Sequence, residues 1–152
     1  MGDVTQEDLT QQEQELIEEA REALDNAYAP YSEFKVGAAL RTSDGSIYRG
    51  CNVENASYGL TNCAERTAMF KAVSEGKREF TDIAIMLDVE EGVGAPCGAC
   101  RQVMNEFNAG MNVLMGTTSG NLEKASLDQL LPNSFGANYL EPPEDEPSEP
   151  AR

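Results

Sequence analysis

The sequence predicts an α/β domain, layered as an α/β/α sandwich around a mixed β-sheet. An amphipathic helix and a hairpin open the chain, and helical and strand patterns then alternate as far as residue 131. Helices that alternate with strands in this way cover the faces of a sheet. Because 152 residues are enough to bury a core, we expect one layered domain.

The first helix is expected from about Thr5 to Tyr28. Apolar residues recur there at helical spacing, and acidic residues fill the opposite face. Thr5 and Asp8 form only a weak capping-box pattern, because the apolar periodicity starts well after them. Pro30 ends the element.

Turn residues and alternating apolar positions place the other elements. Residues 43–46 are Ser-Asp-Gly-Ser, a turn that joins two strands into a hairpin. Gly76 occupies the usual position just after a helix. The expected strands cover 34–40, 47–53, 83–89, 111–115 and 121–125, and the other expected helices cover 63–74, 97–110 and 126–131.

Acidic residues dominate the charge of the chain. There are 27 Asp and Glu against 11 Lys and Arg, a formal net charge of −16, and residues 1–140 keep −12 of it. The Pro- and Glu-rich segment 141–152 cannot bury enough apolar surface to order itself, so we expect a catalytic domain over 1–140 and a disordered acidic tail. The acidic body fits either a salt-adapted (halophilic) protein or an ordinary acidic cytoplasmic one.

The composition also argues against several classes of partner. Phosphate backbones are bound by patches of Lys and Arg, which this sequence does not contain. No segment resembles a membrane span or a signal peptide, and thiols kept as metal ligands suit a reducing compartment. We therefore expect a cytoplasmic protein that binds neither nucleic acid nor membrane.

Three cysteines and a glutamate predict a hydrolytic zinc centre. Cys63-Ala64-Glu65 is followed far downstream by Cys97-Gly98-Ala99-Cys100. Three protein ligands leave the fourth zinc position for water, whose pKa the metal lowers. Glu65 is then placed to move that water's protons, a pattern typical of zinc nucleobase deaminases.

Other uses of these cysteines remain open. A redox Cys-x-x-Cys pair would leave Cys63 and Glu65 unexplained. A closed structural zinc site needs a fourth ligand, and because the chain has no histidine, Cys51 is the alternative. Arg66 follows Glu65 and is either a donor to a thiolate sulfur or an exposed helix arginine.

A second polar pattern lies beside the predicted hairpin. Asn52 and Glu54 are two residues apart, so on a strand their side chains share a face. An amide and a carboxylate on one face can bind the vicinal hydroxyls of a sugar, and the alternative is a polar strand edge. Phe34 is either a wall of a base pocket or a core residue.

These patterns together resemble the cytidine deaminase family in its short, homotetrameric form. The likeness covers about 16–135 and rests on Pro30-Tyr31-Ser32, Lys35-Val36-Gly37-Ala38, Cys51 to Tyr58, Cys63 to Arg66, Pro96 to Gln102, Leu130-Leu131-Pro132 and Ser134-Phe135. The resemblance implies hydrolysis of cytidine, or deoxycytidine, to uridine or deoxyuridine and ammonia in pyrimidine salvage. The acid-rich first helix and the tail depart from the family pattern.

The resemblance also implies a role for each site residue. One Zn²⁺ per chain would be held by Cys63, Cys97 and Cys100, with Glu65 as the proton shuttle and Arg66 supporting a thiolate.

For the nucleoside, Phe34 would line the base pocket, Asn52 and Glu54 would bind the ribose, and the backbone near Ala64 would read the pyrimidine. Neighbouring subunits would complete each site, so Ala56, Tyr58 and Phe135 would serve an adjacent chain.

Two other functions remain as alternatives. A blasticidin-type deaminase shares the zinc motif but differs in its nucleoside contacts, and the pair Asn52 and Glu54 argues against it. A noncatalytic, zinc-stabilised interaction module would have no use for Glu65 beside an open coordination position.

Overall fold

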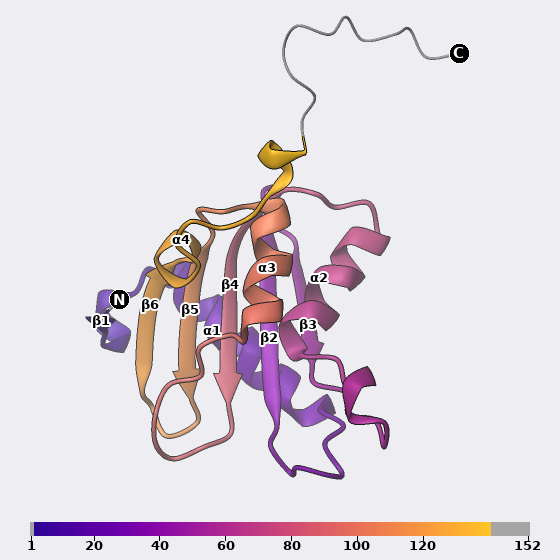
Figure 1. Ribbon diagram of the computed structural model, residues 1–152. Coiled ribbons are helices and arrows are strands. Elements are labelled where there is room, and N and C mark those ends of the chain that lie inside the picture. The colour runs from indigo at the N-terminus through magenta and orange to yellow at the C-terminus, as the bar shows by residue number, and fades with distance from the viewer. Residues whose placement is uncertain (1, 141–152) are drawn as a thin grey trace, which may run out of the picture.

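One mixed sheet with helices on both faces forms the fold (Figure 1). The computed structural model describes residues 2–140, and the predicted acidic tail lies outside them. Within this range six strands pair in the order β1-β6-β5-β4-β2-β3, with β4 and β5 parallel and the other neighbours antiparallel. The strands are β1 Gly2–Asp3, β2 Val36–Thr42, β3 Ile47–Cys51, β4 Phe80–Leu87, β5 Asn112–Thr117 and β6 Leu122–Ser126.

The alternation of side chains along each strand creates two separate hydrophobic clusters. Ala38 and Leu40 of β2 belong to one cluster, whereas Ala39 between them belongs to the other, as the strand period of two requires. Helix α1 (Gln11–Ala23) covers the second face, and α2 (Ala64–Ser74), α3 (Gly98–Phe107) and α4 (Leu127–Leu130) cover the first (Figure 1). The predicted α/β/α sandwich is therefore confirmed.

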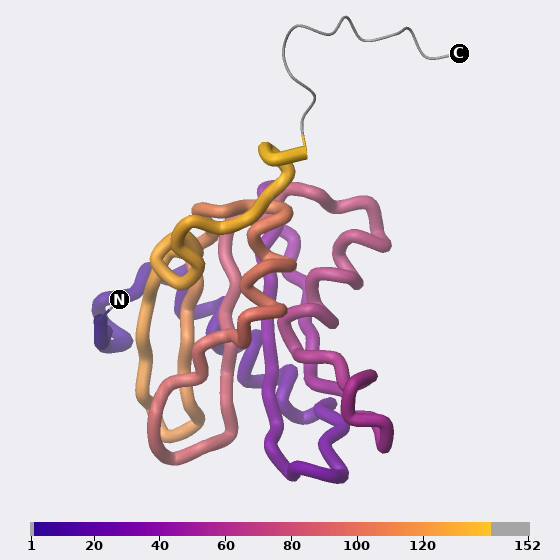
Figure 2. Tube along the Cα trace, viewed as in Figure 1, coloured from indigo at the N-terminus to yellow at the C-terminus, as the bar shows by residue number. Residues whose placement is uncertain are grey.

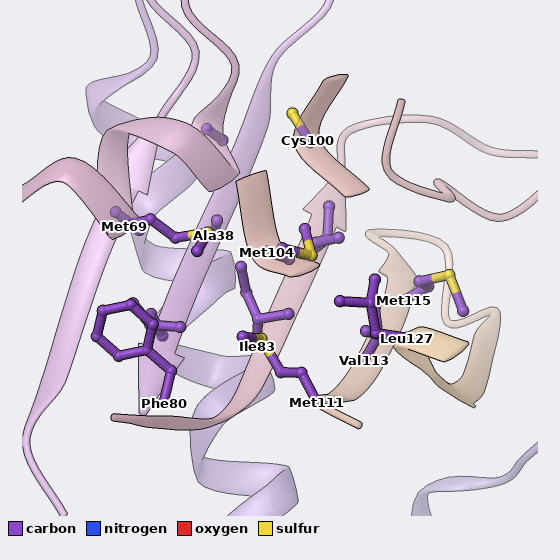
Figure 3. Close-up of a cluster of buried hydrophobic side chains, with 14 of the residues drawn as sticks. Ala38, Met69, Phe80, Ile83, Cys100, Met104, Met111, Val113, Met115 and Leu127 are labelled. Atoms are coloured by element: carbon purple, nitrogen blue, oxygen red, sulfur yellow. The ribbon is translucent and has the colours of Figure 1, made fainter. Parts of the chain in front are cut away.

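Methionines fill much of the cluster beneath α2 and α3. Met69, Met104, Met111 and Met115 are all fully buried there. Figure 3 shows Cys100 on the same helix as Met104, one turn away and at the border of this cluster. The hydrophobic core thus fixes the position of one thiol of the predicted metal site.

The first helix is shorter than predicted. A 3₁₀ turn at Gln6–Asp8 precedes α1, and a second one at Leu24–Asn26 follows it. The prediction of one helix from Thr5 to Tyr28 was wrong because the chain is extended at Thr10, whose hydroxyl accepts a hydrogen bond from the Glu13 N–H at 3.1 Å. That capping box starts α1, while the Thr5–Asp8 box caps only the preceding turn.

Buried polar contacts also hold the start of α1 against the sheet. The Glu13 carboxylate accepts hydrogen bonds from Lys124 Nζ at 2.7 Å and from Asn112 Nδ2 at 2.9 Å. These partners lie on β6 and β5, far away in the sequence. None of the helices in the described range is long and apolar enough to cross a membrane.

The remaining elements follow the predicted order with small shifts at their ends. The hairpin of β2 and β3 turns at Gly45, whose φ of 89° is readily adopted by glycine. Strand β1 was not predicted, because two residues carry no periodicity. It pairs with β6 at the edge of the sheet, where Figure 2 shows the N-terminal segment.

A glycine lets α2 approach the sheet closely. A Cβ atom on Gly50 of β3 would lie 2.4 Å from the Ala64 carbonyl oxygen and 2.4 Å from the Ala68 nitrogen, both backbone atoms of α2. Real Cβ atoms do not come this close, so only glycine fits unless the helix moves. Gly50 therefore sets how closely the N-terminus of α2, which carries Cys63 and Glu65, approaches the sheet.

We predict that Gly50→Ala displaces the first turns of α2 and destabilises the fold. The free energy of unfolding should fall by about 1–3 kcal/mol, the usual cost of overpacking, and metal content should fall with it. Urea denaturation and metal analysis measure the two effects. The control is Gly59→Ala, where an added Cβ meets no atom within 4 Å; equal stability of both variants would contradict the steric account.

Candidate active site

Two helix N-termini meet over one face of the sheet and bring three thiols together. Cys63 is the N-cap of α2, Cys97 is the N-cap of α3, and Cys100 lies in the first turn of α3. Their sulfur atoms all lie within 4.8 Å of one another. This spacing allows all three to bind a single metal ion.

The helix ends also suit thiolates. Cys97 Sγ accepts a hydrogen bond from the Cys100 N–H at 3.5 Å, and both N-caps have the extended backbone that precedes a helix. The free N–H groups and the partial positive charge of a helix N-terminus stabilise a nearby anion. The local fold therefore offsets part of the negative charge of the three sulfurs.

Arg66 adds a full positive charge to this cluster. Its Nη2 donates to Cys63 Sγ at 3.2 Å. The neighbouring Cys100 thiol and the Arg66 guanidinium lower the pKa of the Cys63 thiol. Arg66 Nε is buried and has no hydrogen-bond partner among residues 2–140. One N–H donor of the guanidinium is therefore still available for a negatively charged acceptor. An all-thiolate donor set with such a counter-charge fits Zn²⁺.

Glu65 lies beside the sulfurs in the first turn of α2. Its side chain is 5% exposed, and Oε2 accepts a hydrogen bond from the Cys100 thiol at 3.2 Å. Burial raises the pKa of this carboxyl above its usual range. A carboxyl with a raised pKa is suited to take up and release protons near neutral pH.

A pocket of about 410 Å³ opens next to Glu65. Its size falls within the range of small-molecule sites. Of the predicted site residues, Phe34, Asn52, Glu54, Cys63, Ala64, Glu65 and Cys97 line it. It lies at the end of the sheet where β4 finishes and β2 begins, beside the N-termini of α2 and α3 (Figure 1).

Other residues of the pocket wall were not predicted from the sequence. These are Ser32, Val36, Thr61, Ile85, Leu87, Gly94 and Ala95. Strand periodicity could have placed Ile85 and Leu87 on the same face as Ile83. For Ser32 and Thr61, which lie in irregular segments, no periodic signal existed.

The predicted sugar-binding pair lies in an extended segment beyond β3. Both Asn52 and Glu54 face the pocket, but the Asn52 amide is already engaged. Its Oδ1 accepts from the Val36 N–H at 3.0 Å, and its Nδ2 donates to the Phe34 carbonyl at 2.7 Å. Asn52 thus holds the wall that carries Phe34, with one N–H left for a ligand.

The three residues expected to serve an adjacent chain lie outside the main pocket. Tyr58 lines a neighbouring hollow of about 380 Å³, whose wall also includes Ser32, Glu54 and Thr61. Ala56 is exposed nearby. Phe135 is 57% exposed and stacks on Tyr139 with ring centroids 5.5 Å apart. The described chain therefore does not bring Ala56 or Phe135 into its own pocket.

Cys51 lies apart from the thiol cluster. Its Sγ donates to the Asn26 carbonyl at 3.3 Å, on the side of the turn that follows α1. The end of β3 directs it there, while the three clustered sulfurs lie at the N-termini of α2 and α3. The alternative of a closed four-cysteine site loses its fourth ligand in this arrangement.

Comparison with known proteins agrees with this geometry. A family model described as the cytidine and deoxycytidylate deaminase zinc-binding region matches residues 10–117. The chain belongs to this deaminase family. Cytidine deaminases of Sporosarcina psychrophila and Halalkalibacterium halodurans are 52% and 54% identical over 128 residues, which cover 84% of this chain and 93% and 96% of theirs.

A solved structure supports the same family and fold. The crystal structure of a cytidine deaminase from Burkholderia pseudomallei matches with a TM-score of 0.78 and 52% identity, over 84% of this chain and 100% of that one. A blasticidin-S deaminase of Bacillus cereus is 31% identical over 137 residues, which cover 86% of this chain and 96% of that protein. Membership of a zinc-binding deaminase family and the three clustered thiols together identify Zn²⁺ as the cofactor.

We predict that Cys51→Ala leaves the zinc content at one ion per chain. Cys100→Ser, by contrast, should lose most of the metal, because Cys100 belongs to the thiol cluster and Cys51 does not. Metal analysis of both purified variants, after dialysis against a weak chelator, checks the difference. Loss of zinc from Cys51→Ala would show that Cys51 is a ligand.

Proposed function

We propose that the protein is a zinc-dependent hydrolase that converts cytidine and deoxycytidine to uridine and deoxyuridine with release of ammonia. The observation that carries this proposal is the position of Glu65. Its buried carboxyl contacts the Cys100 thiol and lines a pocket of about 410 Å³. The names of the similar proteins supply the substrate class.

In this proposal Cys63, Cys97 and Cys100 hold the zinc ion. When bound, the metal supplies a water that is acidic enough to act as a nucleophile near neutral pH. Glu65 accepts a proton from the attacking water, which adds to C4 of the pyrimidine. Glu65 passes this first proton to ring N3. It then takes the second proton from the new C4 hydroxyl and gives it to the amine, so that a C4=O bond forms, the C4–N bond breaks and ammonia leaves.

The other wall residues bind and orient the nucleoside. Phe34 offers an apolar face to the base, and the backbone at Cys63 and Ala64 reads the edge of the pyrimidine. At the ribose, Asn52 donates a hydrogen bond and the Glu54 carboxylate accepts one. Arg66 balances the charge of the thiolates through its contact with Cys63.

The two alternative functions have less support. The pair Asn52 and Glu54 in the pocket wall favours a sugar with free hydroxyls over a blasticidin-type substrate. A noncatalytic zinc module gives no reason for a buried carboxyl with a raised pKa beside the metal site. Ammonia release from cytidine and from blasticidin S, measured side by side, separates the three functions.

We predict that Glu65→Gln lowers kcat by at least about 100-fold, the usual contribution of a general acid–base group. Zinc content and thermal stability should stay near wild type, because the amide fills the same space. Glu75→Gln, an exposed position at the C-terminus of the same helix, is the control and should be fully active. Near-normal turnover by Glu65→Gln would refute the proposed mechanism.

We further propose that the protein acts as a cytoplasmic homotetramer in which neighbouring chains complete each pocket. Exposed aromatic residues support this proposal, since Tyr58 is 76% and Phe135 is 57% exposed. Ala56, Tyr58 and Phe135 would then contact the pocket of an adjacent chain. Free thiols at the metal site suit the reducing cytoplasm.

The acidic surface makes this assembly salt-dependent, as expected of a salt-adapted protein. Residues 1–140 carry −12, and the Debye length shrinks from about 30 Å at 0.01 M salt to about 3 Å at 1 M. We predict that oligomer size and activity rise together over this range. Sedimentation and activity measured in parallel, on the full chain and on a version ending at residue 140, check this. A stable, fully active tetramer in dilute buffer would remove the support for salt adaptation.

A further inference from the structure

Ser32 contacts the Glu54 carboxylate, and both residues line the pocket. The Ser32 hydroxyl donates to Glu54 Oε2. Glu54 Oε1 accepts two backbone hydrogen bonds, from the Tyr31 N–H at 2.9 Å and from the Ser32 N–H at 3.1 Å. Three donors from one turn of chain therefore surround a carboxylate that lies 22 residues further along.

The direction of the Ser32 hydroxyl is itself fixed. Its oxygen accepts a hydrogen bond from the Phe34 N–H at 3.0 Å. A serine hydroxyl has one proton to donate, and this proton is used at Glu54. Ser32 therefore links the backbone of the expected base-pocket wall to the carboxylate expected at the ribose.

The Glu54 carboxylate has few hydrogen-bond acceptor sites left for a ligand. A carboxylate has about four lone-pair sites, two on each oxygen. Oε1 has both of its sites filled by backbone N–H groups, and Oε2 has one filled by Ser32. One acceptor site is left, and it is on Oε2. The hydrogen bond from Ser32 also lowers the pKa of Glu54, which keeps it an anion that only accepts.

The surrounding backbone explains why this contact can be rigid. The Glu54 N–H donates to the Tyr28 carbonyl at 2.8 Å, and the Tyr28 N–H donates to the Asn52 carbonyl at 2.9 Å. These backbone hydrogen bonds hold the segment at Tyr28 against residues 52–54, independently of the contact between the Ser32 and Glu54 side chains. Ser32 and Glu54 also line both neighbouring hollows, so their contact lies on the boundary between the two.

We propose that Ser32 is a positioning residue for the nucleoside, which holds Glu54 so that one acceptor site on Oε2 receives a sugar hydroxyl. This role rests on the proposed cytidine deaminase function. The hydroxyl proton of Ser32 is donated to Glu54, so the contribution that Ser32 makes through this contact depends on the sugar hydroxyls of the substrate and not on the metal site.

The test compares two side chains of the same shape, Ser32→Thr and Ser32→Val, of which only threonine keeps the hydroxyl. With cytidine, the valine variant should show a KM roughly 10-fold above that of the threonine variant, the effect of losing one hydrogen bond to a charged group. The kcat values should stay within about two-fold, as expected for loss of substrate binding alone. Zinc content and the midpoint of thermal unfolding, measured on both, should match.

Two further measurements separate positioning from a general structural effect. With 2′,3′-dideoxycytidine, which lacks the vicinal 2′ and 3′ hydroxyls, the two variants should have equal kcat/KM. In a Glu54→Gln background, Ser32→Val should raise KM no further. Ser32→Ala repeats the comparison if the valine variant does not fold.

Equal KM values of the two variants for cytidine, or an equal loss on the dideoxynucleoside, would overturn the proposal while leaving the deaminase function in place. Absence of ammonia release from cytidine by the wild-type protein would instead overturn the proposed function, and the role of Ser32 with it.

Discussion

The convergence of two helix N-termini over one face of the sheet determines most of what this protein can do. The first turns of α2 and α3 bring three sulfurs within 4.8 Å of one another and supply free N–H groups that stabilise thiolates. This convergence needs close packing, which Gly50 permits beneath α2 and the methionine-rich cluster supports beneath α3 (Figure 3). The position of Glu65 follows from the same packing, because it lies two residues after Cys63.

A second constraint holds the opposite wall of the pocket. The segment that precedes β2 is irregular, and Glu33 has a φ of 59°, which is uncommon for a residue with a side chain. Asn52 and Glu54 bind this segment through their side chains, at Phe34, Val36 and Ser32. Residues that look from the sequence like ligand contacts are therefore also structural contacts. The same groups that define the pocket restrict how many hydrogen bonds a ligand can make.

Charge acts at two scales in this molecule. Within the site, Arg66 and the helix ends offset the thiolates, so a local excess of negative charge is tolerated. Over the whole body the acidic residues outnumber the basic ones, and several basic side chains are used in ion pairs, such as Arg49 with Glu19 and Glu22. Self-repulsion of the body acts against association, whereas Tyr58 and Phe135 expose apolar surface on which the proposed assembly depends.

The sequence alone predicted the class of fold, the order of nearly all elements and the three thiols that cluster in the structure. Periodicity identifies helices and strands, and the residue types Cys, Glu and Arg at fixed spacing specify zinc chemistry, because both signals are local. Tertiary structure alone decided the break at Thr10, the exclusion of Cys51 from the thiol cluster, the engagement of the Asn52 amide and the contact of Ser32 with Glu54. These features depend on segments that are far apart in the chain and meet only after packing, and no local pattern encodes such a meeting.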